Sequence, residues 1–403
     1  MISPSFVRFL DRTTPPHIVT LVLLTGLGAL NMSIFLPSLA QMAEEFGTTY
    51  GVMQLSVSSY LAAVGVLQLF VGPISDRFGR RRVLLWSLAI FLIASLGAMT
   101  AQSVGAFLIF RMMQATVAST MVLSRAIIRD VVSLEESASM IGYVTMGMSI
   151  VPLLGPMIGG ALAEAFDWRA SFAFLVAAGG AVWLLCWFDL GETVRGGGTG
   201  FAEQLATYPE LLTSPRFWGY SLCAAFGSGA FFALLGGASY VSTDIFLLTP
   251  FWTGVALGAP ALGYMLGNFL SGRYSQGIGV DRMALAGTAV TLAGLTVSAT
   301  VTGFVVDAPL VFFGFCFFIG LGNGMMLPNV MAGLISVRPH LAGTASGLGG
   351  TLMVAGGAGL SQLAGGVMSP GSGTLPLLAL MWATSAASVL SILYVMRRAR
   401  RLA

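Results

Sequence analysis

The sequence predicts an all-α integral membrane protein with twelve transmembrane helices in two pseudo-symmetric bundles of six. Hydrophobic residues make up 56% of the 403-residue chain, and charged residues make up only 9%. Long apolar segments recur along the chain, and a bilayer core about 30 Å thick needs roughly 20 apolar residues per helix. Because these segments are continuous rather than alternating, they are typical of helices and not of membrane β-strands.

Twelve segments have the length and composition of membrane-spanning helices. In the first half their approximate ranges are 18–40, 50–72, 83–100, 104–124, 140–163 and 170–190. In the second half they are 217–241, 252–270, 283–304, 310–337, 342–368 and 375–396. The 52 glycines fit this assignment, because small residues let helices approach one another closely in lipid.

The longest connection, residues 191–216, separates six spans from six. We therefore expect an N-terminal bundle over residues 1–190, a cytoplasmic linker over 191–216 and a C-terminal bundle over 217–403. We expect a short helix on the inner membrane surface within the linker, with an apolar side formed by Phe201, Leu205, Tyr208, Leu211 and Leu212. The segment GPISDRFGRRR after the second span corresponds to SGRYSQGIGVDR after the eighth, which indicates duplicated halves.

All nineteen basic residues are arginines, and they are sorted by side. If the N-terminus is cytoplasmic, Arg169 is the only one outside, whereas Arg111 lies within the fourth span and the others lie inside. This bias in short loops predicts that both termini are cytoplasmic. The net charge of +3 is then a topology signal rather than evidence for nucleic acid, and the cluster from Arg397 to Arg401 meets anionic lipid headgroups.

The strongest local motif is the connection after the second span, which reads GPISDRFGRRR over residues 72–82. Here the chain resembles the major facilitator superfamily, whose signature loop has glycine, aspartate, arginine, glycine and paired basic residues in this order. The resemblance implies a latch between the two halves on the cytoplasmic side, with Arg125 or Arg129 as the partner of Asp76. The candidate latch residues are Gly72, Asp76, Arg77, Gly79, Arg80, Arg81, Arg125 and Arg129.

The fourth span contains Arg111 and Gln114, which share one helix face because they are three residues apart. A guanidinium at this depth costs several kcal/mol, so it is expected to face the bundle interior and to be functional. In drug-exporting members of the superfamily, the matching arginine lies near the central cavity and supports proton coupling. The structural alternative is that Arg111 binds backbone carbonyls of the first span.

The fifth span contains Gly155, Pro156, Gly159 and Gly160, which resemble the motif that marks exporters within the superfamily. The proline bends the helix, and the glycines allow it to pack closely against its counterpart in the other half. With the Asp167-Trp168-Arg169 sequence, the chain is most similar to the bicyclomycin-resistance (Bcr/CflA) branch of drug:proton antiporters. That resemblance implies a monomer in a bacterial inner membrane, with membrane lipids around it.

One departure from that branch is the absence of its aspartate in the first span, where this chain has Ser33. A carboxylate in a low-dielectric cavity is the usual group through which proton and substrate compete. No acid of the chain falls clearly at mid-membrane, and both histidines lie near cytoplasmic ends. The coupling candidates are therefore Arg111 and, if the seventh helix extends inward, Asp244; the alternative for Asp244 is a solvated helix end.

By resemblance, spans one, four, seven and ten line the central cavity, with two side chains entering from span two. The candidate substrate-binding residues are Asn31, Ser33, Phe35, Gln54, Tyr60, Arg111, Gln114, Phe231, Phe232, Asn323 and Asn329. A cavity with an arginine and no acid disfavours organic cations, so we expect neutral, zwitterionic or anionic substrates. We predict no cofactor and no metal site.

These observations favour a secondary transporter that exports small amphiphilic molecules by alternating access, with protons as the possible coupling ion. The second hypothesis is an importer or uniporter of a neutral or anionic metabolite without carboxylate-based proton coupling. A membrane enzyme is disfavoured, because two peripheral histidines and no core carboxylates leave little catalytic material. A transport-dead sensor or scaffold would show no saturable stabilisation by small molecules.

Overall fold

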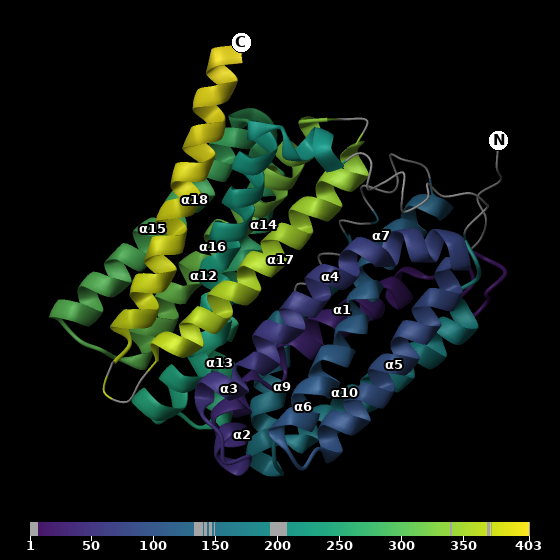
Figure 1. The fold of residues 1–403 in the computed structure, drawn as a ribbon, viewed down its shortest axis with the longest axis horizontal. Coiled ribbons are helices and arrows are strands. Elements are labelled where there is room, and N and C mark those ends of the chain that lie inside the picture. The colour runs from purple at the N-terminus through teal and green to yellow at the C-terminus, as the bar shows by residue number, and fades with distance from the viewer. Residues whose placement is uncertain are drawn as a thin grey trace.

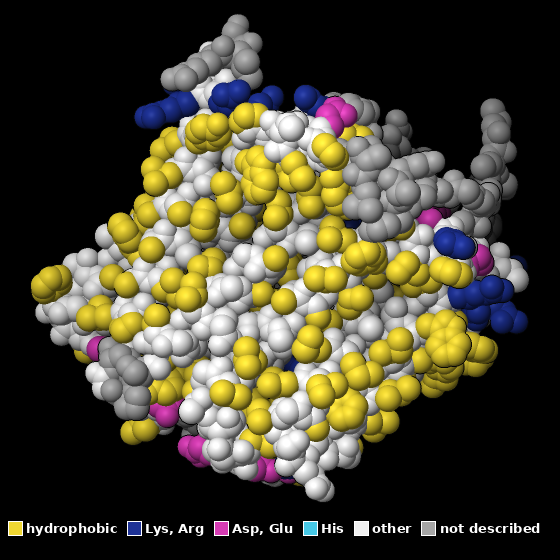
Figure 2. All heavy atoms as spheres, viewed as in Figure 1, with side chains coloured by type: hydrophobic (Ala, Val, Ile, Leu, Met, Phe, Trp, Pro, Cys, Tyr) yellow, Lys and Arg dark blue, Asp and Glu magenta, His cyan; other side chains and the backbone are white. Residues whose placement is uncertain are grey.

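The computed structural model describes residues 7–132, 140, 143–144, 147–148, 150–193, 208–338, 341–368, 371 and 373–402. Within these residues, nine helical segments are long and apolar enough to cross a membrane, and Val151–Ala165 is a shorter apolar helix. Apolar side chains cover much of the surface between the two charged ends of the molecule (Figure 2). The predicted all-α membrane fold is confirmed.

The helices of the first half follow the predicted spans closely. Their bounds are α1 Ile18–Ser33, η1 Leu36–Ser38, α2 Leu39–Glu45, α3 Tyr50–Met53, α4 Leu55–Phe78, α5 Arg80–Thr100, α6 Val104–Met113, η2 Gln114–Val117, α7 Ala118–Val131, α9 Val151–Ala165 and α10 Arg169–Asp189. The second half contains α12 Pro215–Tyr240, the π-turn η3 Val241–Ile245, α13 Pro250–Ala256, α14 Gly258–Ile278, α15 Val280–Phe304, α16 Pro309–Ser336, α17 Ala342–Val367 and α18 Leu375–Leu402.

Two spans of the first half are interrupted at similar depth. The first span changes from α1 to the short 3₁₀ helix η1, where Pro37 lacks an N–H and its ring clashes with the preceding turn. The fourth span changes from α6 to the 3₁₀ helix η2 directly after Met113. Such a tightened turn inside a long helix often marks a functional hinge. Arg111 lies in the last turn before the second interruption.

The helices form two groups, one from α1 to α10 and one from α12 to α18, and both chain termini lie at the same end (Figure 1). The groups contact each other toward the opposite end, where Tyr50 of α3 donates a hydrogen bond to the Gly236 carbonyl of α12 at 2.9 Å. Along α4 and α17, Gln54 donates to Ser361 at 2.8 Å and Ser58 donates to Gln362 at 2.7 Å.

The motif after the second span is a turn of one residue rather than the predicted loop. Helix α4 continues to Phe78, and α5 begins at Arg80. The residue between them, Gly79, has φ +95°, which side chains other than glycine rarely adopt. In the second half, Gly279 has φ +92° between α14 and α15. This equivalence supports the internal duplication inferred from the sequence.

The glycines of the fifth span allow close packing as predicted, but against a different partner. By internal symmetry its counterpart is the eleventh span, α17, whereas α9 packs against α13, the start of the eighth span, and α17 packs against α4. A Cβ placed on Gly160 would lie 2.2 Å from the Pro250 carbonyl oxygen, and one on Gly254 would lie 2.2 Å from that of Pro156. The backbones of α9 and α13 therefore touch through reciprocal glycines.

Candidate functional site

The candidate site is centred on Arg111, whose side chain is fully buried as predicted. Its guanidinium donates hydrogen bonds to the Asn31 side chain of α1 at 3.1 Å and to the Gln114 side chain of the same span. Its Nε donates to the Ser56 carbonyl of α4 at 3.4 Å. Arg111 thus joins three spans, and the partner expected in the first span is a side-chain amide rather than a backbone carbonyl.

Two aromatic rings enclose the guanidinium of Arg111. Its central carbon lies 4.2 Å from the centroid of the Phe35 ring and 4.7 Å from that of Tyr60. Aromatic faces attract a cation electrostatically, and the attraction increases where water is excluded. Within the described residues Arg111 forms no ion pair. The charge is therefore balanced by carbonyl oxygens and ring faces and by no carboxylate.

Gln114 is held from its other side by a second hydrogen bond. Its amide nitrogen donates to the Ser95 hydroxyl of α5 at 2.7 Å, and Ser95 in turn donates to the Phe91 carbonyl at 2.7 Å. This chain fixes the amide so that its oxygen faces Arg111. The buried Nη2 of Arg111 and Nδ2 of Asn31 have no hydrogen-bond partner among the described residues. Both donors are buried, so an acceptor oxygen would reach them only when the surrounding helices move apart.

Of the predicted binding residues, the structure brings together Asn31, Phe35, Tyr60, Arg111 and Gln114. Four other polar candidates lie elsewhere: Ser33 donates to the Ala29 carbonyl at 3.1 Å, Gln54 bonds Ser361, Asn329 bonds Ser271, and Asn323 lies inside the second half with its amide oxygen unpartnered among the described residues. In the part of the chain that the structure describes, none of these four side chains forms a hydrogen bond with Arg111.

Ser33 occupies the position where the related branch carries an aspartate, and it faces the fifth span. A Cβ placed on Gly155 would lie 2.7 Å from the Ser33 hydroxyl oxygen. A longer acidic side chain at position 33 would compete with α9 for this space. Ser33 therefore packs closely against Gly155 of α9.

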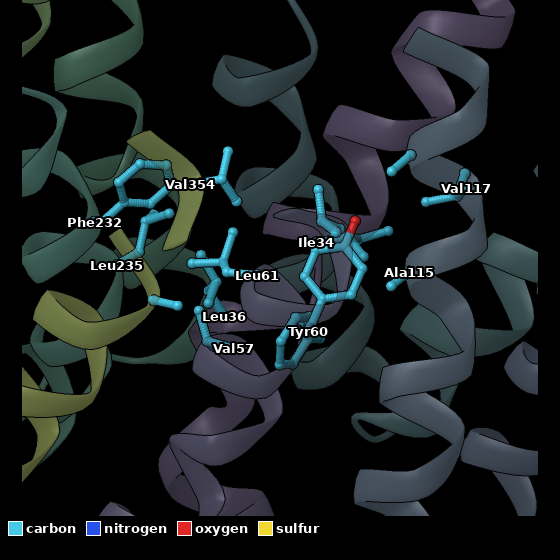
Figure 3. Close-up of a cluster of buried hydrophobic side chains, with 14 of the residues drawn as sticks. Ile34, Leu36, Val57, Tyr60, Leu61, Ala115, Val117, Phe232, Leu235 and Val354 are labelled. Atoms are coloured by element: carbon cyan, nitrogen blue, oxygen red, sulfur yellow. The ribbon is translucent and has the colours of Figure 1, made fainter. Parts of the chain in front are cut away.

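The two phenylalanines predicted in the seventh span lie in the second half. Phe232 is buried and packs on Gly357 of α17, whereas Phe231 is half-buried. Figure 3 shows Phe232 separated from Tyr60 by apolar side chains of both halves. The residues of this layer include Leu36, Val57, Leu61, Leu235 and Val354. Phe232 thus belongs to the apolar contact between the halves.

Asp244 lies at the exposed end of the seventh span. It lines an open hollow of about 420 Å³ together with Glu44 of α2 and Glu164 of α9. All three side chains are exposed. The hollow lies between the two halves, because Glu44 and Glu164 come from the first half and Asp244 comes from the second.

The latch motif forms a different ion pair from the predicted one. Asp76 pairs with Arg80 at 3.0 Å, and the same arginine bonds Asp130 of α7. Neither Arg125 nor Arg129 forms an ion pair within the part of the chain that the structure describes. Arg80 follows Asp76 by one helical turn across Gly79 and therefore lies beside it. Arg80 thus pairs with Asp76 in place of the predicted Arg125 or Arg129.

The remaining arginines of the motif have separate positions. Arg81 donates to the Leu190 and Trp187 carbonyls, which lie at the carboxyl end of α10, at 2.7 and 3.0 Å. Arg77 is exposed and lies over the Phe78 ring. Gly72 has open space where a Cβ would be. The motif therefore joins α4, α5, α7 and α10 within the first half.

Several important residues were missed from the sequence. Ser56 and Ser95 contribute a carbonyl and a hydroxyl to the Arg111 network, and serines inside apolar helices carry no distinguishing signal. Ser361 and Gln362 pair across the halves, and adjacent polar residues in an apolar span were the available signal. Asp189, assigned to the cytoplasmic side, is fully buried at the end of α10 and accepts three hydrogen bonds from residues 10–20.

Comparisons with known proteins agree with the fold and the motifs. The family model of the Major Facilitator Superfamily matches residues 21–362. Multidrug resistance protein D of Escherichia coli strain K12 is 29% identical over 370 residues, which are 90% of this chain and 91% of that protein. The bicyclomycin resistance protein homolog of Haemophilus influenzae is 26% identical over 364 residues, or 88% and 89% of the two chains.

A solved D-xylose-proton symporter shares the fold, with a TM-score of 0.74 at 14% identity over 94% of this chain and 96% of that chain. The chain therefore belongs to the Major Facilitator Superfamily, a family of transporters. Its resemblance to the bicyclomycin-resistance branch is confirmed.

Proposed function

We propose that this transporter exports small amphiphilic compounds that are neutral, zwitterionic or anionic. The observation that carries this proposal is the buried Arg111, which is balanced by neutral oxygens and ring faces alone. An organic cation would bring a second positive charge beside it in a low-dielectric site, where repulsion between like charges is strong. A carbonyl, hydroxyl or carboxylate oxygen can instead accept from Arg111 Nη2 and Asn31 Nδ2. The names of the two relatives support drug-like substrates.

Transport would proceed by alternating access between two bundles, residues 1–190 and 217–403, joined by the linker 191–216. The start of the linker is attached to the first half, where Thr193 donates to Asp130 at 3.0 Å. Its end is attached to the second half, where Arg338 pairs with Glu210 at 2.9 Å. With both termini in the cytoplasm of a bacterial cell, the contacts through Tyr50, Gln54 and Gly160 close the outer end.

The proton is the coupling ion in this proposal, and the coupling candidates are Arg111 and Asp244. Glu44 and Glu164 belong to one half and Asp244 to the other, so closing the outer end brings like charges around one hollow. Arg111 then serves the substrate, and Asp244 is the carboxylate whose part in coupling is tested.

The experiment is a thermal-stability panel on the purified protein with compounds grouped by charge. Bicyclomycin is the neutral probe, norfloxacin the zwitterionic one, fluorescein the anionic one and tetraphenylphosphonium the cationic one. We expect saturable increases in Tm with one or more of the first three, and at least tenfold weaker binding of the cation. Arg111→Gln is expected to abolish these increases, whereas Arg77→Gln, an exposed control, is not.

A preferred cation would contradict the proposed substrate class, and no response to any compound would favour a scaffold. Direction is tested separately in vesicles that contain the protein in one orientation. Uptake of the ligand into the cytoplasmic-side compartment without a proton gradient, down its own concentration gradient, would favour the importer or uniporter.

A further inference from the structure

A second hollow, distinct from the Arg111 site, lies at the end of the molecule where both termini lie. It has a volume of about 400 Å³ and is enclosed by α12, the α14–α15 turn, α16 and α18. Its walls combine small residues with the apolar side chains of Ile278, Val280 and Met396. Two arginines also line it, Arg282 from the start of α15 and Arg400 from the end of α18.

The equivalent place in the first half is filled by the protein itself. There Glu192 accepts from the backbone N–H of Arg80 at 2.8 Å, and Arg81 bonds the Leu190 carbonyl at the end of α10. A Cβ on Gly79 would lie 2.3 Å from Glu192. In the second half, a Cβ on Gly279 would have nothing within 4 Å. Of the two equivalent turns, the one at Gly79 is therefore filled by Glu192, whereas the one at Gly279 is open.

The charges around the open turn favour an anion. Arg282 and Arg400 are exposed, and neither forms an ion pair within the described residues. The acid beside them, Asp281, already accepts a hydrogen bond from the Tyr220 hydroxyl at 2.7 Å. Arginine side chains gather around this end of α18 (Figure 2). Guanidinium groups suit phosphate oxygens because their N–H donors form a planar fork.

We propose that this hollow binds the phosphodiester headgroup of an anionic membrane phospholipid. Arg282 and Arg400 bind the phosphate from two helices, and the exposed side chains of Ile278 and Val280 contact the start of the acyl chains. Basic pockets between helices at the cytoplasmic surface are a known way to bind such headgroups. The site lies outside the transport site, so it adds a lipid ligand to the proposed function.

The test measures the Tm of the full chain in dodecyl maltoside during titration with dihexanoyl phosphatidylglycerol. Dihexanoyl phosphatidylcholine and inorganic phosphate are titrated in parallel. We expect saturable stabilisation by phosphatidylglycerol and at least tenfold weaker effects of the other two compounds. The double variant Arg282→Gln/Arg400→Gln is expected to raise the half-saturating concentration of phosphatidylglycerol at least tenfold. The control Arg397→Gln/Arg398→Gln removes the same amount of charge from positions outside the hollow. It is expected to change the half-saturating concentration of phosphatidylglycerol less than twofold.

A second variant separates charge from shape. Ser336 is exposed and lines the hollow, so Ser336→Trp fills it while both arginines remain. We expect the same loss of phosphatidylglycerol binding, with unchanged elution as a folded monodisperse protein. If the Arg397→Gln/Arg398→Gln control loses as much phosphatidylglycerol binding as the Arg282→Gln/Arg400→Gln variant, the lipid is held by diffuse charge attraction. That result would overturn the proposal. Equal stabilisation by phosphatidylcholine, or by inorganic phosphate, would overturn the assignment to an anionic lipid.

Discussion

At the scale of single residues, Arg111 illustrates how a buried cation is held without an acid. Its fork of donors reaches Asn31 of α1 and Gln114 of its own span, and its plane lies against Phe35 and Tyr60. Each contact depends on a flat group with donors in several directions. A lysine has a single rotatable ammonium group and cannot reproduce these contacts together.

We therefore predict that Arg111→Lys destabilises the protein although the charge is kept. One amide oxygen, of Asn31 or Gln114, would remain buried without a donor, which costs about 1–3 kcal/mol. The free energy of unfolding in detergent is expected to fall by that amount, and ligand stabilisation is expected to be lost. The exposed Arg77→Lys is the control and is expected to change neither. Full ligand binding by Arg111→Lys would contradict the role of the planar fork.

A second residue-scale prediction concerns the glycine turns. Gly79→Ala places a Cβ at positive φ and against Glu192, whereas Gly279→Ala has the positive φ with open space around it. Backbone strain of this kind costs about 1–3 kcal/mol, and the clash adds to it only at position 79. We expect the loss of Tm to be largest for Gly79→Ala and intermediate for Gly279→Ala. Gly72→Ala, in a helix with open space, is expected to cause no loss. Equal losses at 79 and 279 would contradict the contribution of Glu192.

The residue scale also shows where sequence reasoning ends. Arg111 and Gln114 were predicted to face the bundle interior because burial of a charge constrains where it can point. Their partners Ser56 and Ser95 were not predicted, because a serine in an apolar helix commonly bonds its own preceding turn. Asp76 was assigned a distant arginine, although Arg80 becomes its neighbour once the turn shortens to one glycine.

At the scale of helices, the contact of α9 with α13 decides how closely the two halves meet. Gly160 faces the Pro250 carbonyl, and Gly254 faces that of Pro156, each with no room for a Cβ. The sequence indicated that the fifth span packs closely, but not on which helix. Hydropathy determines which segments are helices, whereas the partner of a helix depends on packing across the whole molecule.

We predict that Gly160→Ala or Gly254→Ala shifts the protein away from the conformation described above. Overpacking costs typically 1–3 kcal/mol, and about 1.4 kcal/mol corresponds to a tenfold change in population. Spin labels at the exposed positions Gln41→Cys and Leu247→Cys are expected to show that the population with the longer label-to-label distance increases about tenfold. The native cysteines are buried, so they do not compete for the label. Gly180→Ala, in α10 with open space, is the control. An unchanged distance distribution in both glycine variants would show that this contact does not control closure.

At the scale of the whole molecule, the two halves share a plan but have different tasks. The first half carries the buried cation, the enclosed network and the filled turn at Gly79, whereas the second half carries Asp244 and the open turn at Gly279. The sequence predicted the duplication from two similar motifs. It did not predict this division, because each contact depends on side chains from spans far apart in the chain.

The division leads to the last prediction, that a proton gradient acts through Asp244 and not through Arg111. In proteoliposomes with an imposed pH gradient, Asp244→Asn is expected to lose most gradient-driven accumulation while retaining ligand stabilisation. Arg111→Gln is expected to lose the stabilisation by ligand that Asp244→Asn retains. Asp307→Asn is the control, because that exposed acid is bound by Thr374 at 3.0 Å and does not line the hollow. Equal gradient-driven accumulation by the Asp244→Asn and Asp307→Asn variants would show that Asp244 takes no part in coupling. If Glu44→Gln and Glu164→Gln also accumulate as much as Asp307→Asn, the hollow as a whole takes no part in coupling.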